Sequence, residues 1–468
     1  MARRVMYRRA FLQLVGAGAG AAMLAACVPV TTPAPAEPTQ PPEELPEAGA
    51  TPTLAEVAAA TPAGAAAEAA DLTGELEIFS WWTSGGEVEA LQALYDILTA
   101  QHPAITINNA ALAGGQGQGG NMKALLETRM LGGQPPDSFQ VHLGRELIDG
   151  HVIAGRMEPL DELYASEGWT EVFQPDVIEI ASYEGHPWSV PVNIHRSNCL
   201  WYRPSRLETV GVTEPPATWD EFFEVAQKLK EKDIPAMAIG EQGGAGGFSG
   251  HILENILVSV LEPEAYRGLF DGTTPWDHEG VTKSLEIMNQ IYDYANPDFP
   301  STSWGDINDR FVADDGPAMM LMGDWTRGVL QSKGFADYHW TVAPGTQGLF
   351  MVLSDSFGLP KNAPHRDNAI AFLKVCGSRE GQDAFNPIKV SISARTDADR
   401  TKYDEYLQEA MDDFANNEGV PSIQHGAAVK QSFLLDYDIA LADLAANRDV
   451  DKCRGMLVEA AKVAEIMK

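Results

Sequence analysis

The stretch GELEIFSWWTSGGEVEALQALY, residues 74–95, decides the fold class, because a strand pattern passes directly into a helix pattern within it. Strand-like alternation runs to Trp81 and Trp82, a glycine pair follows, and an amphipathic helix is predicted from about residue 86. Neighbouring strand side chains point in opposite directions, so only one of the two indoles is expected to enter the core. The other remains at the carboxyl end of the strand, where open α/β sheets bind their ligands.

Strand and helix patterns continue to alternate along the chain, which indicates an α/β fold with a largely parallel sheet covered by helices. The next segments in this rhythm are AITINNAAL (104–112), a predicted helix near 121–131, and DSFQVHL (137–143). Further strand patterns come much later, at AMMLMG (318–323) and LFMVLSDSFGLP (349–360). The stretch 201–300 and the last eighty residues are mainly helical in pattern, and in the former Thr218 is a predicted helix N-cap with Glu221 as its capping-box partner.

The first 71 residues are predicted to serve export and tethering. Residues 1–26 combine a basic start, an apolar run and no acidic residue, as in a signal peptide. Arg8 and Arg9 resemble a twin-arginine export motif, and LAAC, ending at Cys27, resembles the lipobox of bacterial lipoproteins. Residues 27–71 are rich in Pro, Ala and Glu and contain no Lys or Arg, so a disordered tether is predicted there.

The charge of the chain excludes several classes of partner. Its formal charge is −33, and loss of the four arginines in residues 1–26 would make it −37. Such an acidic protein is not suited to nucleic acid or to anionic surfaces, whereas a neutral ligand fits it. The roughly 400 residues after the tether exceed one ordinary core, so two lobes are expected. Apart from Cys27 the cysteines are Cys199, Cys376 and Cys453, and without a CxxC pair neither a zinc site nor a disulfide framework is supported.

One motif points to a nucleotide, but its context argues against this. Gly115, Gly117 and Gly120 form GxGxxG between a predicted strand and a predicted helix, with Asp137 further on. A dinucleotide site needs its acidic residue at the end of the second strand, whereas Asp137 begins a strand, and the glycines follow the second strand rather than the first. The loop is therefore interpreted as a glycine-rich connection near a binding cleft, and no cofactor is predicted.

Enzyme signatures are also missing from the sequence. It contains no GxSxG, HExxH or Walker A motif. A glycosidase needs two carboxylates at a defined separation, and sequence spacing cannot reveal such a pair in so acidic a chain. A carbohydrate-processing enzyme therefore stays open as an alternative to a binding protein.

Aromatic, amide, imidazole and charged residues lie at the ends of the predicted strands and in the loops that follow. Together they are typical of a carbohydrate site, because indole faces cover the C–H faces of a pyranose while polar groups bond its hydroxyls. The residues are Trp81, Trp82, Gln140, His142, Asn193, His195, Trp304, Trp325, Asp355, Lys389 and His425.

From about residue 74 to its end, the chain resembles the family-1 extracellular solute-binding proteins of bacterial ABC importers. The resemblance is carried by VPVNIHRSNCLWYRPSRL, PPATWDEF, AMMLMGDW and LSDSFGLPKNAPHRDNAIAFL. The first of these is similar to the family's first crossing between lobes, and AMMLMGDW is similar to its return crossing. SWWTSGGE, TRMLGGQPPDSFQVHLG, FMVLSDSFGLPK, GQDAFNPIK and HGA resemble the branch that binds glucose, galactose or mannose.

The resemblance implies a sugar site at matching positions, with Trp82 as the stacking platform and Trp81 mainly packed. The chain departs from the branch in two places, at the SGG turn near Trp81 and Glu87, which is shorter, and at the segment 240–250, which is rich in glycine. The implied sugar contacts are Trp82, Gln140, His142, Asn193, Trp304, Trp325, Asp355, Lys389 and His425, with Trp81 and Glu87 added.

The resemblance also implies a two-lobed periplasmic-binding-protein fold, with 72–190 and 323–388 in one lobe and 191–322 and 389–468 in the other. A neutral monosaccharide is expected between the lobes, and no bond is made or broken. The expected partners are ABC permease subunits with their cytoplasmic ATPase. The protein is expected to be an exported monomer, held at the outer face of the cell membrane or in the periplasm by lipidated Cys27. A binder of a disaccharide or polyol is the other open alternative.

Overall fold

The computed structural model describes residues 72–83, 85–112, 120–241 and 247–467. The predicted export motif at Arg8 and Arg9, the lipid-bearing Cys27, the tether, most of the glycine motif and part of the segment 240–250 lie outside these residues. Among the helices that are described, none is long and apolar enough to cross a membrane.

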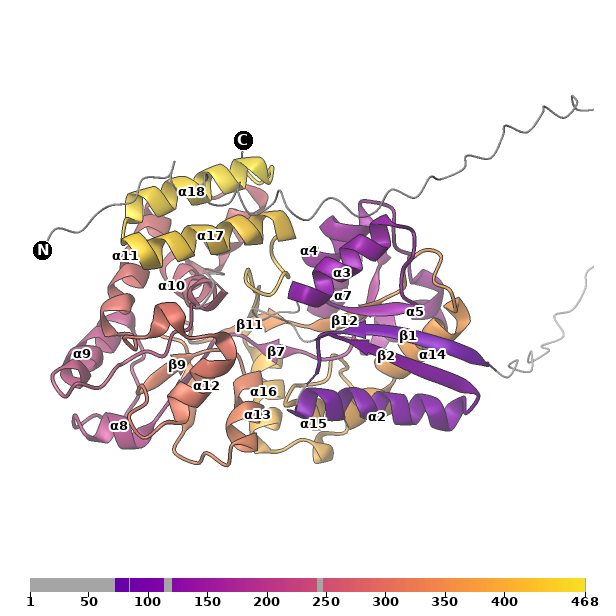
Figure 1. Cartoon of the computed structure of the whole chain (residues 1–468), viewed down its shortest axis with the longest axis horizontal. Coiled ribbons are helices and arrows are strands. Elements are labelled where there is room, and N and C mark those ends of the chain that lie inside the picture. The colour runs from indigo at the N-terminus through magenta and orange to yellow at the C-terminus, as the bar shows by residue number, and fades with distance from the viewer. Residues whose placement is uncertain (1–71, 84, 113–119, 242–246, 468) are drawn as a thin grey trace, which may run out of the picture. The chain divides into compact units, whose positions relative to one another are not determined.

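The first sheet contains five strands in the order β2-β1-β3-β12-β6 (Figure 1). β1 pairs in parallel with β2 and with β3, which confirms the predicted βαβαβ unit. β12 pairs antiparallel with β3 and with β6, so the sheet is mixed rather than largely parallel. The strands are β1 Gly74–Ser80, β2 Ile105–Ala111, β3 Ser138–His142, β6 Ser189–Pro191 and β12 Asp355–Gly358.

Helices cover both faces of this sheet. α2 (Gly85–Gln101) buries Leu91, Leu94 and Leu98, whose spacing puts them on one face of the helix. Burying each such leucine contributes about 1.5–3 kcal/mol relative to leaving it exposed. α14 (Arg366–Gly377) and α15 (Arg379–Lys389) pack beside α2, whereas α3 (Gly120–Leu131) belongs to a small cluster with Phe79 and Phe139.

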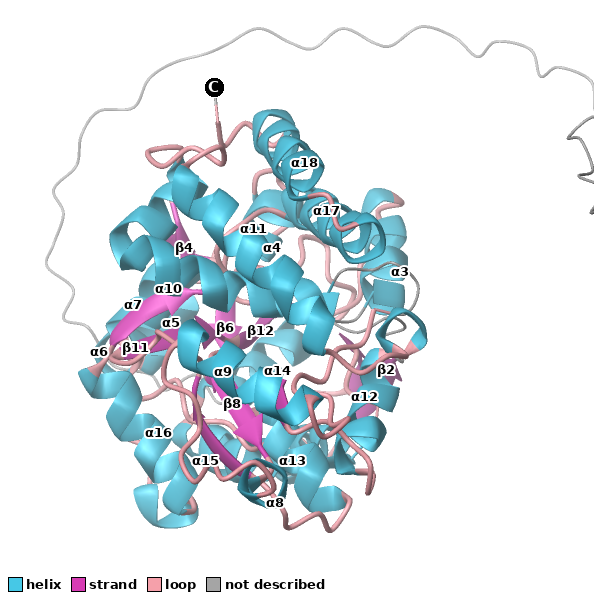
Figure 2. Ribbon diagram, turned by 90° about the vertical axis from the view of Figure 1, so that its left-hand side faces the viewer, coloured by secondary structure: helices cyan, strands magenta, loops and turns pink. Residues whose placement is uncertain are grey.

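Two large hydrophobic cores account for most of the buried side chains. The first core joins apolar residues from Leu76 to Ile194 with others from Phe350 to Phe414. The second core joins residues from Cys199 to Met351 with others from Val420 to Ala464. In Figure 2 the strands lie inside a surrounding layer of helices.

A three-stranded sheet in the order β13-β11-β7 connects the two cores. Side chains alternate along β11 (Leu349–Leu353): Leu349 and Met351 enter the second core, while Phe350 and Val352 enter the first. Its neighbours are β7 (His195–Arg196), which is antiparallel to it, and β13 (Glu418–Pro421), which is parallel. We call these three strands the bridging sheet.

The chain passes from one core to the other at the bridging sheet. VPVNIHRSN does cross, as expected, because β6 belongs to the first sheet and β7 to the bridging sheet. The segment 349–360, in which a strand pattern was expected, divides at Ser354 into β11 and β12, so this is where the chain returns to the first sheet. The return crossing therefore does not lie at AMMLMGDW.

The residues of the two hydrophobic cores also place the boundaries between the lobes at positions that differ from the expected ones. Residues 323–343 contribute Leu330 and Ala343 to the second core. Residues 390–414 contribute Tyr406 and Phe414 to the first. We therefore call the described residues within 72–194 and 354–414 the first lobe, and those within 197–348 and 422–467 the second lobe.

The second lobe contains an antiparallel sheet in the order β10-β8-β9 and most of the long helices. The capping box predicted for α9 is confirmed: Thr218 Oγ1 accepts from the Glu221 backbone N–H at 3.2 Å, and Glu221 Oε2 accepts from the Thr218 N–H at 3.2 Å. α10 is kinked at Glu262, directly before Pro263, which cannot donate a helical hydrogen bond.

The remaining elements connect these layers. The strands of the second lobe are β8 Cys199–Tyr202, β9 Met319–Leu321 and β10 His339–Val342. The longer helices are α9 Trp219–Lys230, α10 Gly247–Asp271, α11 Glu279–Ile291, α12 Trp304–Val312, α13 Trp325–Ser332, α16 Glu405–Asn416, α17 Gln431–Asn447 and α18 Val450–Val463. Short elements are α4 Arg145–Leu147, η1 Ile148–Val152, α5 Asp161–Glu167, α6 Trp169–Val172, α7 Pro175–Ala181, β4 Ser182–Tyr183, β5 His186–Pro187, α8 Pro204–Glu208, η3 Tyr292–Tyr294, η4 Phe299–Ser301 and η5 Arg400–Lys402.

Candidate functional site

A buried polar network lies where β1 and β3 end and the chain crosses between lobes. Gln140 Nε2 donates to Asp355 Oδ1 at 2.9 Å, and Asn193 Nδ2 donates to Asp355 Oδ2 at 2.9 Å. Ser80 Oγ and the Trp81 backbone N–H both donate to Gln140 Oε1, at 2.7 and 3.1 Å. The sequence alone predicted Gln140, Asn193 and Asp355 as site residues, and the structure brings all three together.

The carboxyl group of Asp355 is ionised in this network. Burial by itself raises its pKa, but the charge of Lys389, the neighbouring His142 and His195, and the Asn193 hydrogen bond together lower it below the usual value. Asp355 is 4% exposed, so it is a fixed negative charge almost fully removed from water.

Lys389 extends the network toward the second lobe. Its Nζ lies 3.1 Å from Glu87 Oε1 and 3.3 Å from His195 Nε2. His195 Nδ1 makes a short hydrogen bond to Asp324, the residue before α13. Glu87, in the first turn of α2, therefore reaches the site through its ion pair with Lys389.

Imidazole and indole rings from both lobes meet beside these charges. His425 contacts Trp325 with ring centroids 4.9 Å apart, and it contacts His142 of the first lobe at 5.8 Å. Trp325 also contacts His195 at 5.6 Å, edge to face. The predicted residues His142, His195, Trp325 and His425 are thus adjacent although more than 280 residues separate the first from the last.

The two tryptophans of the opening stretch differ in burial. Trp82 is 1% exposed and packs in the first core against Phe357 and Phe385, with centroids 5.9 and 5.2 Å away. Trp81 is half-buried, and its ring lies 5.0 Å from that of His142. The expectation that only one indole enters the core is correct, but the indole in the core is Trp82.

Trp304 is the one predicted site residue whose side chain lies outside the described residues. Its backbone begins α12, which Ser303 caps by accepting from the Asp306 N–H at 3.1 Å. The glycine-rich segment 240–250 is described only at its two ends, so the predicted contribution of its central residues also lies outside the described part.

Sequence reasoning missed two charged residues next to His142. Lys123 Nζ and His142 Nδ1 lie 2.9 and 2.8 Å from the same oxygen of Glu146. Burial opposes ionisation of Glu146, but the charges of Lys123 and His142 outweigh it and lower the pKa to about 2. Lys123 also lies 5.1 Å from the Trp81 ring centroid. The spacing of His142 and Glu146, four residues apart in FQVHLGRE, was the available signal.

A second group missed by sequence reasoning lies in the second lobe. His251 and Glu254, on α10, face His425, and the three are buried. Burial lowers the pKa of His251 to about 3 and raises that of Glu254 to about 7. Burial and the neighbouring His251 and His142 also lower the pKa of His425 well below its usual value. Because about 170 residues separate His251 and Glu254 from His425, no local sequence motif could reveal this cluster.

Comparisons with known proteins agree with this architecture. The family model for bacterial extracellular solute-binding proteins matches residues 51–383. An uncharacterised ABC transporter extracellular-binding protein of Pyrococcus horikoshii is 34% identical, over 83% of this chain and 87% of its own. A probable sugar-binding periplasmic protein of Rhizobium meliloti is 30% identical, over 88% and 99% of the two chains.

Solved structures share the fold at low sequence identity. A chitin oligosaccharide binding protein superimposes with a TM-score of 0.74 at 18% identity, covering 84% of this chain and 99% of that one. The fold is accordingly the two-lobed α/β fold expected from the sequence, with its candidate site assembled from both lobes. By its family match and by its relatives, this chain belongs to the bacterial extracellular solute-binding proteins.

Proposed function

We propose that this chain captures a neutral monosaccharide between its lobes, glucose in the first place and galactose or mannose as further candidates. One observation carries the proposal. The amides of Gln140 and Asn193 and the charge of Lys389 act on the carboxylate of Asp355, and aromatic rings from both lobes lie beside it. Buried, pre-oriented polar groups next to indole faces suit a pyranose, which offers hydroxyls at its rim and C–H groups on its faces. The relative named as a probable sugar-binding protein supports the same class of ligand.

Each part of the site has a role in this proposal. Asp355 has already accepted one amide donor on each oxygen, and its remaining lone pairs accept from sugar hydroxyls. Lys389 donates a further hydrogen bond to the sugar, and Trp81 provides a stacking face. The proposed contacts are Trp81, Gln140, His142, Asn193, Trp304, Trp325, Asp355, Lys389 and His425, with Glu87 acting through Lys389.

We assign the stacking role to Trp81 and a packing role to Trp82. The half-buried ring of Trp81 next to His142 supports this, as does the complete burial of Trp82 among phenylalanines. A sugar that touches both lobes favours their closed arrangement, so binding shifts a hinge equilibrium and no covalent chemistry is required.

The proposed destination of the sugar is an ABC permease with a cytoplasmic ATPase, to which the closed monomer presents both lobes. We further propose that Arg8 and Arg9 direct export and that lipid on Cys27 holds the protein at the membrane. A Cys27→Ser variant should then be released from the membrane fraction and lack the mass of the lipid. Retention of that variant at the membrane with unchanged mass would contradict the anchor.

The test of the ligand class is a melting-shift panel of monosaccharides, disaccharides and polyols. A ligand present at 100 times its Kd stabilises the folded state by about 2.7 kcal/mol, which raises Tm by several degrees. Glucose, galactose or mannose should give the largest shift at equal concentration. A larger shift with a disaccharide or a polyol would replace the monosaccharide assignment with one of those ligands.

A carbohydrate-processing enzyme is distinguished by the fate of the sugar. After long incubation with the protein, a bound sugar should be recovered unchanged by chromatography and mass spectrometry. Catalytic conversion of the sugar, in excess over protein, would overturn the binding function.

A further inference from the structure

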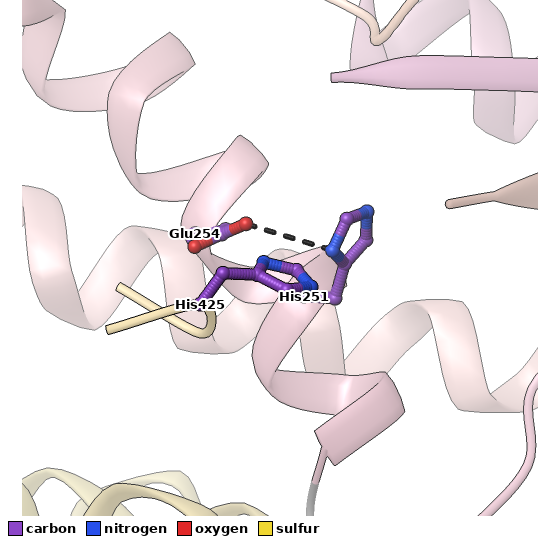
Figure 3. Close-up of side chains that lie close together, drawn as sticks. All are labelled: His251, Glu254 and His425. Atoms are coloured by element: carbon purple, nitrogen blue, oxygen red, sulfur yellow. Dashed lines mark ion pairs between the residues drawn. The ribbon is translucent and has the colours of Figure 1, made fainter. Parts of the chain in front are cut away.

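The cluster of His251, Glu254 and His425 brings three metal-ligating side chains together in the second lobe. His251 and Glu254 are three residues apart on α10 and therefore share one helix face. His425 comes from the loop between β13 and α17 and faces that helix (Figure 3). No local sequence motif links these residues, so the site exists only in the folded chain.

The spacing of the donor atoms suits a single metal ion. One nitrogen of each imidazole and one carboxylate oxygen lie within 4.8 Å of one another. His251 Nδ1 and Glu254 Oε1 are 3.6 Å apart, too far for a hydrogen bond. Two ligands that each lie about 2.0–2.1 Å from a tetrahedral zinc ion are about 3.3 Å apart, so a small inward movement would complete the site.

The contacts and charges of the cluster are consistent with a missing cation. His251 is 1% exposed, and its Nδ1, the ring nitrogen that faces Glu254, has only long contacts, 3.6 Å to Glu254 Oε1 and 3.5 Å to Ser197 Oγ. Glu254 is fully buried, and among the described residues its one ion pair is with His251 rather than with Lys or Arg. A buried carboxylate without a counter-charge is costly, and a divalent cation would supply that charge.

The surroundings of the cluster resemble the outer contacts of a metal site. Ser422 Oγ lies 2.9 Å from His425 Nδ1 and donates to Glu254 Oε2 at 2.8 Å. Ser197 Oγ and the Gln424 backbone N–H also donate to Glu254, each at 2.9 Å. Such hydrogen bonds orient ligating imidazoles and carboxylates.

We propose that His251, Glu254 and His425 bind one divalent transition-metal ion of the zinc class. Two imidazole nitrogens and one carboxylate oxygen form a donor set that zinc accepts, and three protein ligands leave a coordination position for a small molecule. His425 is also a proposed sugar contact, so the test of the metal site is made on sugar-free protein, where its result does not depend on sugar binding.

The test uses the full chain without a polyhistidine tag. Titration with Co²⁺, followed by visible absorption, should saturate at one ion per chain, and Zn²⁺ should displace the bound Co²⁺. His251→Asn and Glu254→Gln should each weaken Co²⁺ binding at least about tenfold, since even outer contacts of metal sites contribute 10- to 100-fold. The matched control is His186→Asn, which removes another histidine–carboxylate pair, 2.9 Å from Asp161, and should leave Co²⁺ binding unchanged.

Several outcomes would overturn the proposal. They are the absence of saturable Co²⁺ binding by the unmodified protein, a thiolate charge-transfer band, loss of binding in His186→Asn, or full-strength binding in folded His251→Asn and Glu254→Gln. The absorption of the unmodified protein decides the question even where a variant does not fold. As a second measurement, Zn²⁺ should raise the Tm of the unmodified protein.

Discussion

Asn193 and Asp355 hold each other by two reciprocal hydrogen bonds. The Asn193 amide nitrogen donates to Asp355 Oδ2 at 2.9 Å, and the Asp355 backbone N–H donates to Asn193 Oδ1 at 2.7 Å. The first residue lies on the crossing between β6 and β7, and the second begins β12, just after the return crossing. The pair therefore joins the two crossings at the point where the candidate site is built.

This relationship makes Asp355 a pre-oriented acceptor, so we predict that Asp355→Asn weakens sugar binding about 10- to 150-fold. Hydrogen bonds to charged groups contribute roughly 1.5–3 kcal/mol, and the substitution removes the charge while keeping the shape. Isothermal calorimetry with the sugar chosen by the melting panel measures the change. Asp367→Asn, at an exposed carboxylate on α14, should bind normally, and unchanged affinity in Asp355→Asn would remove Asp355 from the site.

The tryptophan pair yields a prediction in which two neighbouring residues respond differently. Trp82→Ala should lower the free energy of unfolding by about 3–5 kcal/mol, because it leaves a cavity in the first core. Trp81→Ala should change stability less but weaken sugar binding by about 1–3 kcal/mol through the lost stacking face. Urea unfolding and calorimetry separate the two effects.

Trp188→Ala is the control for this pair, because Trp188, like Trp81, is half-buried against the small cluster around Phe79 but is not a proposed sugar contact. It should leave sugar affinity unchanged. A larger loss of affinity in folded Trp82→Ala than in Trp81→Ala would restore the assignment implied by family resemblance.

Much of the fold follows from local patterns in the sequence. The alternation in GELEIFS and the apolar face of α2 are short-range signals, and the capping box at Thr218 and Glu221 is complete within four residues. The crossing point at Ser354, in contrast, could not be predicted from a local pattern. The sequences of β11 and β12 are both typical of strands. Only their neighbours show that the two strands belong to different sheets, because β11 pairs with β7 and β13, whereas β12 pairs with β3 and β6.

The residues of the candidate site also differ in whether a local sequence pattern could predict them. Gln140, His142 and Asp355 follow strand patterns, so chemistry at strand ends could be recognised before their contacts were known. His251 and Glu254 lie in a helix with buried residues all round, where nothing in the local pattern distinguishes a polar pair from core packing. Which of two adjacent indoles enters the core also depends on tertiary packing, here on Phe385 of α15.

The confirmed capping box allows a test of stability that is separate from binding. Thr218→Ala should lower the free energy of unfolding by about 0.5–2 kcal/mol, because it leaves a backbone N–H at the start of α9 without its acceptor. Urea unfolding measures this loss. Thr218→Ser, which keeps the oxygen, should be close to the unmodified protein, and equal destabilisation by both substitutions would show that the hydroxyl is not the cause.

Glu146 should make stability depend on pH in a predictable direction. Its pKa in the folded protein is about 2, against an ordinary value of 4.5, because Lys123 and His142 outweigh the effect of burial. A carboxylate with a lowered folded pKa stabilises the protein above its unfolded pKa, and this stabilisation is lost as the pH falls toward the folded pKa. At about 1.4 kcal/mol per pKa unit, this lowering corresponds to a contribution of about 3–4 kcal/mol near neutral pH.

We therefore expect Glu146→Gln to be less stable than the unmodified protein at pH 7 and pH 5, and the difference to fall by about half at pH 3. The measurement is urea unfolding of both proteins, without sugar, at each pH. Glu127→Gln is the control, because Glu127 is 46% exposed and its ion pair with Arg156 contributes little. If the difference between Glu146→Gln and the unmodified protein stayed constant from pH 7 to pH 3, packing and hydrogen bonding rather than the charge of Glu146 would explain its effect.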